Sequence, residues 1–434
     1  MEPALQAAAP LRTPTATANA GHGGAMVVIT TLFFMMGLIT SLNDVLIPHL
    51  KSVYTLNYVQ AMLVQFCFFG AYFIVSWPAG LLIKRLGYQH GAVAGFVLAA
   101  LGCAMFYPAA YGGYAQFLLA FFVLAAGITI MQVAANPYVT ALGDPAKASS
   151  RLTLTQAFNS LGTTIAPTLG GMLILSGAAL APGEVAKLPA AAQQAYRATQ
   201  AATVQLPYLG LAALLLVLAL LFAFVRMPRI SHSDDALHAD ADRHDSVFKH
   251  RHLVLGTIGI FLYVGGEVSI GSFLINFLGE RDVAALAPDA AAHYVSYYWG
   301  GAMVGRFIGF AVMRYVSPGK ALATNAAGAI VLILAAMLGH GAVAMWAVIL
   351  VGLCNSIMFP TIFSMSVNNL GKLTGQASGV LCMAIVGGAL VPFAQGLLAD
   401  AIGLRLSYVV PLACYVFIMG FGLKYANMYR QAVN

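Results

Sequence analysis

The chain has 434 residues, of which 60% are hydrophobic and 8% are charged, and its mean hydropathy is +0.84. Soluble domains carry roughly 25% charged residues, so this composition excludes an ordinary soluble protein and a disordered one. Apolar stretches such as 209–225 lie in segments long enough to cross a hydrocarbon layer of about 30 Å as helices. They lack the short alternating strands of an outer-membrane barrel. The sequence therefore predicts an all-α, multi-pass membrane protein.

The net charge of +7 does not by itself indicate a nucleic-acid partner. Such a partner requires the positive charge to gather on one soluble face. Here the basic residues follow the loops between apolar segments, as expected for a chain whose partner is membrane lipid. The five cysteines lie singly in apolar segments and are expected to be core thiols.

The apolar runs, divided at their charged or Gly/Pro-rich interruptions, predict twelve transmembrane helices. We expect them at 26–48, 60–83, 91–110, 114–141, 152–177, 206–226, 252–279, 291–314, 320–339, 343–367, 375–399 and 405–426.

The distribution of basic residues predicts the orientation in the membrane. With the amino terminus inside, 15 of the 21 Lys and Arg residues fall on the cytoplasmic side, five fall outside, and Arg306 lies within a span. This bias favours cytoplasmic termini, in a bacterial inner membrane.

A charged segment divides the twelve helices into six and six. Residues 227–250 form the longest such stretch, and we interpret them as a solvated cytoplasmic linker. Residues 1–24 are expected to be a cytoplasmic tail. The two predicted domains are then an N-terminal six-helix bundle, 25–226, and a C-terminal six-helix bundle, 251–434. The histidines of the linker match no established metal-ligand motif.

The two halves resemble each other in sequence. Residues 161–171 align with residues 386–396, which lie 225 positions later, and Pro137 aligns with Pro360, 223 positions later. Parallel six-helix repeats related by an axis along the membrane normal are typical of one large class of transporter. A binding site is expected between the halves.

Two acids, Asp44 and Glu267, are embedded in apolar sequence at equivalent places in the repeats, 223 positions apart. An ionised side chain at the bilayer centre costs at least about 2.5–3.5 kcal/mol, so such residues usually face a cavity. Two other interpretations remain open. Asp44 lies near a helix end and can sit in the interfacial zone, and Glu267 can be a structural partner of Arg306.

Uncharged polar residues form a second candidate set. Gln132 and Asn136 are spaced i, i+4, and Gln156, Asn159 and Thr163 are spaced i, i+3, i+7, so each group occupies one helix face. Amides in a membrane must face protein or a watery cavity. Hydrogen bonding between helices is the alternative role for each of them.

These groups suit a neutral polyol, because amides donate to and accept from hydroxyls and carboxylates accept from them. Aromatic residues can cover the C–H face of a sugar, and the candidates are Tyr263, Tyr298, Trp299 and Phe359. Arg306 is expected toward the inner end of its helix. With nothing basic in the set, a sugar is favoured over a phosphorylated or carboxylate substrate.

Four strings make the chain similar to the fucose permease family of the major facilitator superfamily. They are SLNDVLIP at 41–48, AANPYVTALG at 134–143, RLTLTQAFNS at 151–160 and PTIFS at 360–364. The loop at 80–87 resembles the superfamily signature between helices two and three, with Lys84 where many members carry Asp. The resemblance extends from helix one to helix twelve and implies the major facilitator fold.

The resemblance also implies roles for particular residues. Asp44 matches a residue associated with cation coupling, and Gln132, Gln156 and Asn159 match residues that border the sugar site. The fucose permease has an acid at the position of Gln132 and, in our alignment, none at the position of Glu267. This exchange is similar to the glucose/galactose branch of the family.

The sequence therefore predicts a cation-coupled symporter of a hexose such as glucose or galactose, monomeric and working by alternating access without a cofactor. Asp44 is expected to bind the coupling ion, either H+ or Na+, the latter together with Asn43 and Ser41. Glu267 is expected to accept hydrogen bonds from the sugar. The expected sugar contacts are Gln132, Asn136, Gln156, Asn159, Glu267, Tyr263, Trp299 and Phe359.

Three alternatives remain. The first is an L-fucose/H+ symporter, and the second is a membrane sugar sensor that binds without transporting. The third, a membrane-embedded enzyme, is disfavoured because the chain contains no His-Glu-x-x-His, phosphate-cradling loop or Gly-x-Ser-x-Gly motif.

Overall fold

The computed structural model describes residues 19–54, 58–174, 202–225 and 246–428, with a few positions between 188 and 199. Within these ranges, the side chains of some helical residues, including 43–54, lie outside the described set. Most of the expected tail, 1–24, and of the expected linker, 227–250, also falls outside it, so the domain boundaries stay predictions.

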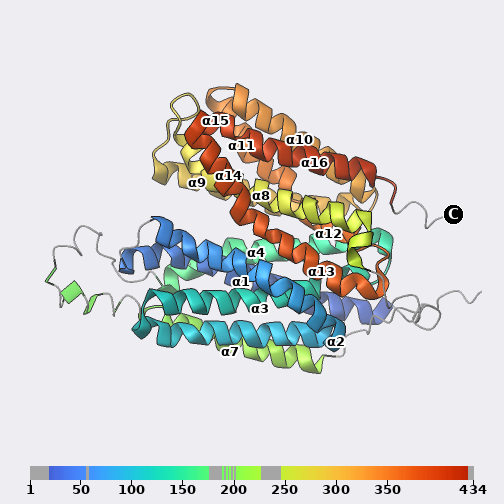
Figure 1. Ribbon diagram of the computed structural model, residues 1–434, viewed down its shortest axis with the longest axis horizontal. Helices are drawn as coiled ribbons and strands as arrows, with labels where there is room; N and C mark the ends of the chain where they lie inside the picture. The colour runs from blue at the N-terminus through green and yellow to red at the C-terminus, as the bar shows by residue number, and fades with distance from the viewer. Residues whose placement is uncertain are drawn as a thin grey trace, which may run out of the picture.

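Every regular element among the described residues is helical, as the composition predicts. Helices satisfy their own backbone hydrogen bonds, which is what a segment surrounded by lipid requires. The elements form two layers that approach each other at one end of the molecule and diverge toward the other (Figure 1).

Among the described residues, the N-terminal half contains five long helices. They are α1 (Asn19–Tyr54), α2 (Tyr58–Gly112), α3 (Tyr114–Ala141), α4 (Ala148–Ile174) and α7 (Gln205–Phe224). Helix α2 contains both of the helices expected at 60–83 and 91–110, joined without an intervening loop. The chain turns between its two arms at Gly87, where φ is +79°, a conformation that glycine adopts readily.

The C-terminal half contains more and shorter elements because several expected helices are interrupted. They are α8 (Arg251–Gly279), α9 (Pro288–Val312), α10 (Pro318–Leu338), α11 (Gly341–Asn355), α12 (Met358–Ser366), α13 (Thr374–Met383), α14 (Gly387–Ile402), α15 (Leu404–Ser407) and α16 (Val409–Lys424). The expected helix 343–367 is α11 followed by α12. The expected helix 375–399 is α13, a single 3-10 turn and α14.

Nine stretches of the described residues are long and apolar enough to cross a membrane, and one of them, Phe66–Gly112, contains both arms of α2. Helices α4 and α9 are also long enough to span, but their sequences contain more polar residues than these nine stretches. They pack against each other between the two halves. Counting both arms of α2 together with α4 and α9 recovers the twelve expected spans.

The two halves repeat one close helix contact. A Cβ atom at Gly162 of α4 would overlap the carbonyl oxygen of Phe34 in α1, and a Cβ at Gly387 would overlap the carbonyl oxygen of Phe261 in α8. Gly387 lies 225 positions after Gly162, which is the offset of the sequence repeat. Small residues let helix backbones approach closely where lipid offers no hydrophobic driving force.

Two proline residues at equivalent places in the repeats each leave a backbone carbonyl without its helical hydrogen bond. A proline inside a helix removes the hydrogen bond to the carbonyl four residues earlier. Pro360 frees the Ser356 carbonyl at the break between α11 and α12, and Arg306 Nε donates to it at 3.2 Å. Pro137 frees the Val133 carbonyl of α3, and Ser378 Oγ of α13 donates to it at 2.9 Å.

We call the end where the halves meet the closed end and define it by three hydrogen bonds. Ser149 and Ser364 share a bond of 2.5 Å, and Ser150 Oγ donates to the Phe310 carbonyl at 2.7 Å. The third is the Ser378 bond to the Val133 carbonyl. Each joins an element of the N-terminal half to one of the C-terminal half, so together they hold the two halves against each other (Figure 1).

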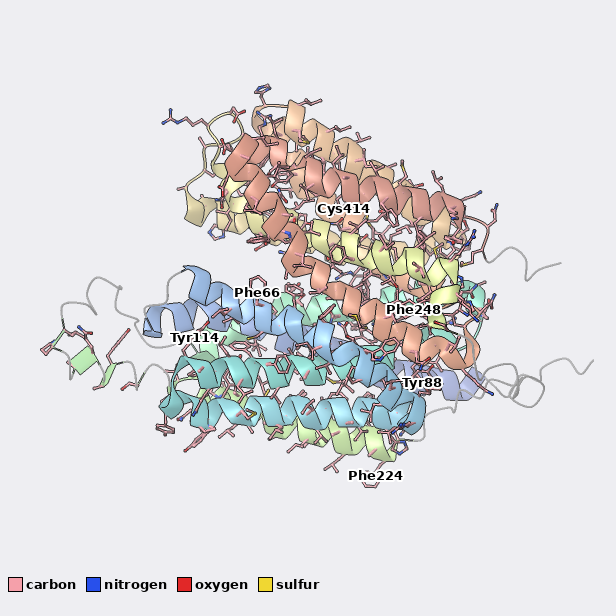
Figure 2. The ribbon with its side chains drawn as sticks, in the orientation of Figure 1. Phe66, Tyr88, Tyr114, Phe224, Phe248 and Cys414 are labelled. Atoms are coloured by element: carbon pink, nitrogen blue, oxygen red, sulfur yellow. The ribbon has the colours of Figure 1, made fainter. Side chains whose placement is uncertain are left out.

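The outer surface exposes large apolar side chains, as a lipid-facing surface does. On α7, Leu206 is 78% exposed and Phe224 is 82% exposed. Figure 2 shows Phe224 directed away from the helices at the edge of the N-terminal half.

The glycine contacts predict a sharp difference between two substitutions. Gly387→Ala forces a Cβ into the Phe261 carbonyl and is expected to destabilise the protein by about 1–3 kcal/mol. Gly420→Ala in α16 meets no atom within 4 Å and is expected to be neutral or slightly stabilising. Thermal unfolding of both variants in detergent measures the difference. Equal midpoints would show that the close contact is not needed.

Candidate functional site

A cavity of about 680 Å³ lies between the halves and takes its walls from both. From the N-terminal half it is lined by residues of α1, α2, α3 and α4, and from the C-terminal half by residues of α8 and α9. Four of the expected site residues border it: Ser41, Asn159, Glu267 and Trp299. Their part in binding stays a prediction, but the structure brings them to one chamber.

Glu267 is the described acid in this cavity. Its side chain is 8% exposed, and its Oε1 atom is buried without a hydrogen-bond partner. Gly271, one turn further along α8, lets the ring of Trp299 pack close to the helix, 3.1 Å from where a Cβ would stand. A buried carboxylate oxygen with no protein partner is an acceptor available to a ligand or to water.

Arg306 also lines the cavity, so the expectation that nothing basic borders the site is wrong. The guanidinium of Arg306 donates a hydrogen bond to the Ser356 carbonyl at the helix break. Its positive charge interacts electrostatically with the Glu267 carboxylate. The signal that could have found it was its position, since a lone cation within an apolar span is by default a site candidate.

The opposite wall is rich in side-chain amide and hydroxyl groups. Asn159 Nδ2 donates to the Phe33 carbonyl of α1 at 2.9 Å, so this amide also joins two helices, as the alternative interpretation supposed. Four more hydroxyl residues border the cavity on this side, and sequence reasoning had singled out only Thr163 as a neighbour of the amide face. They are Thr40, Ser160, Thr163 and Thr164. Ser272 and Ser296 face them from the C-terminal half.

Several expected contacts do not border the cavity. Gln132, Asn136 and Gln156 lie outside its lining, and Asn136 is fully buried with neither polar atom in a hydrogen bond of normal geometry. Cys382 of α13, from the other half, is its polar neighbour. Gln156 is buried as well, and Gln132 is partly exposed, with its Oε1 atom buried.

The three remaining aromatic candidates also lie outside the cavity lining. Tyr298 is fully buried, Tyr263 is 1% exposed and Phe359 is 9% exposed, and the ring centroids of Tyr263 and Phe359 lie 6.5 Å apart. The side chains of Asn43 and Asp44 lie outside the described residues, although helix α1 carries both positions.

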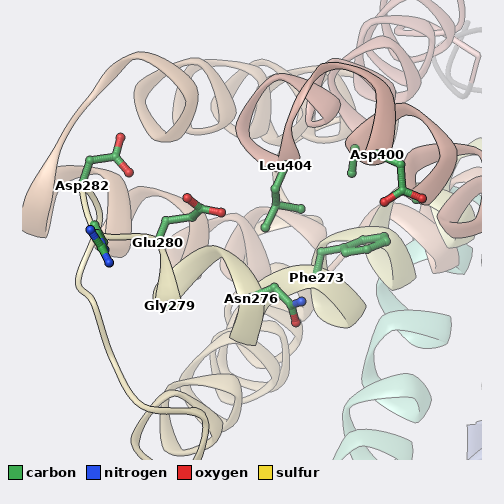
Figure 3. Close-up of a pocket in the computed structure, with 10 residues that line it drawn as sticks. Phe273, Asn276, Gly279, Glu280, Asp282, Asp400 and Leu404 are labelled. Atoms are coloured by element: carbon green, nitrogen blue, oxygen red, sulfur yellow. The ribbon is translucent and has the colours of Figure 1, made fainter. Parts of the chain in front are cut away.

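A larger hollow of about 990 Å³ lies at the far end of the C-terminal half (Figure 3). Its lining belongs to that half alone and includes Glu280, Asp282 and Asp400. Arg405 forms an ion pair with Asp282 there. None of the described residues of the N-terminal half lines it, so the described lining does not relate this hollow to a movement between the halves. We therefore place the functional site in the cavity between the halves.

Comparison with known proteins identifies relatives over nearly the whole chain. The Major Facilitator Superfamily profile matches residues 29–385. The chain is 56% identical over 415 residues to a protein of Brucella abortus named "Glucose/galactose transporter", covering 95% of this chain and 97% of that protein. It is 34% identical over 400 residues to the "L-fucose-proton symporter" of Escherichia coli, covering 91% of each.

Comparison with solved structures identifies the same group of transporters. The crystal structure of the transporter FucP in the outward conformation superposes with a TM-score of 0.85 at 33% identity, over 93% of this chain and 99% of that one.

The geometry predicts which engineered cysteines meet water. In a background with the five native cysteines replaced by alanine, Thr163→Cys borders the cavity and is expected to react with a water-soluble thiol reagent. Asn136→Cys, at a fully buried position, is expected to remain unmodified. Mass shift after timed labelling in detergent measures both. Faster labelling at 136 than at 163 would contradict the placement of the cavity.

Proposed function

The chain belongs to the Major Facilitator Superfamily and, within it, to the fucose permease family, and from this premise we propose that it is a proton-coupled hexose symporter. The observation that carries the proposal is the shared cavity, in which the buried Glu267 carboxylate faces hydroxyl and amide groups of the other half.

The cavity has the composition that a sugar requires. Its carboxylate accepts hydrogen bonds, its hydroxyls accept and donate, and Arg306 donates. Trp299 and the phenylalanines Phe68, Phe69 and Phe121 provide apolar surface for the C–H face of a ring. A pocket of this size, mostly preformed, is typical of small-molecule sites.

Transport proceeds by alternating access as the halves rock about the cavity. The closed end carries the start of α4, the end of α12 and the start of α13. The charge bias puts these ends, and both chain termini, on the cytoplasmic side of a bacterial inner membrane. The conformation is then outward-facing, in agreement with the similarity to FucP in its outward conformation. Gln132, Asn136 and Gln156 join the site when the inner end opens.

Glucose and galactose are the proposed substrates because the relative from Brucella abortus carries both in its name. Gln132 and Glu267 together also distinguish this chain from the fucose permease pattern. Asp44 binds the coupling proton, in line with the proton named for the Escherichia coli relative. An acid in apolar surroundings is biased toward its protonated form, which suits it to bind and release a proton.

Uptake into proteoliposomes tests the proposal. An inward proton gradient is expected to drive accumulation of labelled glucose and galactose above that of L-fucose, and a sodium gradient alone is expected not to. Asp44→Asn is expected to abolish accumulation while exchange of sugar across equilibrated vesicles continues. Accumulation that survives this substitution removes Asp44 from coupling. Binding without any exchange would instead identify a sensor.

Glu267→Gln is expected to weaken sugar binding about tenfold or more. It replaces a charged acceptor by a neutral amide and removes the negative charge that interacts with Arg306. Isothermal titration or Trp299 fluorescence measures the affinity. Glu280→Gln is the matched control, because Glu280 is exposed and borders the other hollow. Unchanged affinity in Glu267→Gln would refute the sugar contact.

A further inference from the structure

Asn355 is the centre of a buried hydrogen-bond network directly behind the cavity. It is the last residue of α11 and is fully buried. Tyr415 Oη of α16 donates to its Oδ1 at 2.7 Å, and its Nδ2 donates to Tyr298 Oη of α9 at 2.8 Å. Tyr263 Oη of α8 donates to its carbonyl at 3.1 Å. One side chain and its carbonyl therefore connect four elements of the C-terminal half.

The network ends at the backbone of Glu267. Tyr298 Oη donates its single proton to the Glu267 carbonyl at 3.1 Å, so it must accept from Asn355 rather than donate to it. This requirement fixes the orientation of the amide, with nitrogen toward Tyr298 and oxygen toward Tyr415. The order of donors runs without a break from Tyr415 through Asn355 and Tyr298 to α8.

Ser356, the residue after Asn355, binds Arg306, the second charged residue of the cavity. The Ser356 carbonyl, freed by Pro360, accepts from Arg306 Nε. The helix break thus connects on one side to the turn of α8 that presents Glu267 and on the other side to Arg306. Asn355 also lies 223 positions after Gln132, the offset that relates Pro137 to Pro360.

We infer that Asn355 is a positioning residue for the sugar site. Through Tyr298 it holds the backbone of α8 at Glu267, and with it the point from which this carboxylate reaches the cavity, without touching the substrate. This inference rests on the proposed function for its substrate. The counterpart of Asn355 in the N-terminal half, Gln132, is an expected sugar contact. Equivalent positions in the repeat therefore have different roles, positioning in the C-terminal half and sugar contact in the N-terminal half.

Two tyrosine substitutions test the inference, with a third as control. Tyr298→Phe removes the bond to the Glu267 carbonyl, and Tyr415→Phe removes the bond that orients Asn355. Tyr408 is equally buried, its hydroxyl has no hydrogen-bond partner in the described structure, and its ring packs on Phe277 at 4.9 Å. Tyr408→Phe therefore removes a buried hydroxyl without touching the network.

Hexose affinity is expected to fall about tenfold in Tyr298→Phe and Tyr415→Phe and to stay unchanged in Tyr408→Phe. In a Glu267→Gln background the same two substitutions are expected to cause no further loss, since the group that they position is gone. A loss that persists in that background, or that also occurs in Tyr408→Phe, indicates general damage to the core and overturns the inference. Unchanged affinity in both network variants overturns it as well.

A second measurement does not depend on the sugar. The infrared band of the Glu267 carboxyl, assigned from the difference between the parent protein and Glu267→Gln, is expected to shift in Tyr298→Phe and not in Tyr408→Phe. If the parent protein binds no hexose, the proposed function fails, and this band alone decides the positioning. An unshifted band in Tyr298→Phe overturns it.

Discussion

A polar group at membrane depth must find a partner inside the protein or face water, and this requirement organises the whole molecule. Glu267 meets it by bordering the cavity between the halves. The carbonyls freed by Pro360 and Pro137 meet it through Arg306 and Ser378. Asn355 meets it by exchanging hydrogen bonds with three tyrosines. For the two carbonyls and Asn355, the residue that satisfies the group comes from another helix, so the same bonds that make burial tolerable also fix the helices relative to each other.

Each half has a backbone carbonyl freed by a proline, and the two carbonyls bind different partners. In the C-terminal half the freed carbonyl binds Arg306 of the same half, and the result is a rigid wall of the cavity. In the N-terminal half the freed carbonyl binds Ser378 of the opposite half, and the result is a contact that rocking must break. A duplicated fold with identical chemistry in both copies could not separate these tasks. The two carbonyls are alike, and the difference between their donors, Arg306 and Ser378, separates the fixed part of the site from its moving part.

The sequence was sufficient for the twelve spans and the repeat, because hydropathy reports lipid-facing segments directly and the 223- and 225-residue offsets report duplication. It was not sufficient for Arg306. The position of this residue along its span predicted a side chain near the inner end, whereas in the structure it donates to the Ser356 carbonyl at the helix break and borders the cavity. Sequence spacing also grouped Gln132 and Asn136 with Glu267, but only Glu267 borders the cavity in this conformation. Which residues the cavity reaches depends on the relative orientation of the two halves, and residue spacing does not encode that orientation. The Asn355 network was beyond reach, since its tyrosines come from three different helices, none of them the helix of Asn355, and no sequence spacing relates them.

The hydroxyl bonds at the closed end have a consequence for how the halves separate there. Replacing one such bond by hydration changes the free energy by only about 0.5–1.5 kcal/mol, and the Val133 carbonyl already lacks an intrahelical partner to lose. The three bonds together therefore oppose separation of the halves at this end by only roughly 1.5–4.5 kcal/mol. A seal made of a few hydroxyl groups is one that water can replace and that can form again when the halves return.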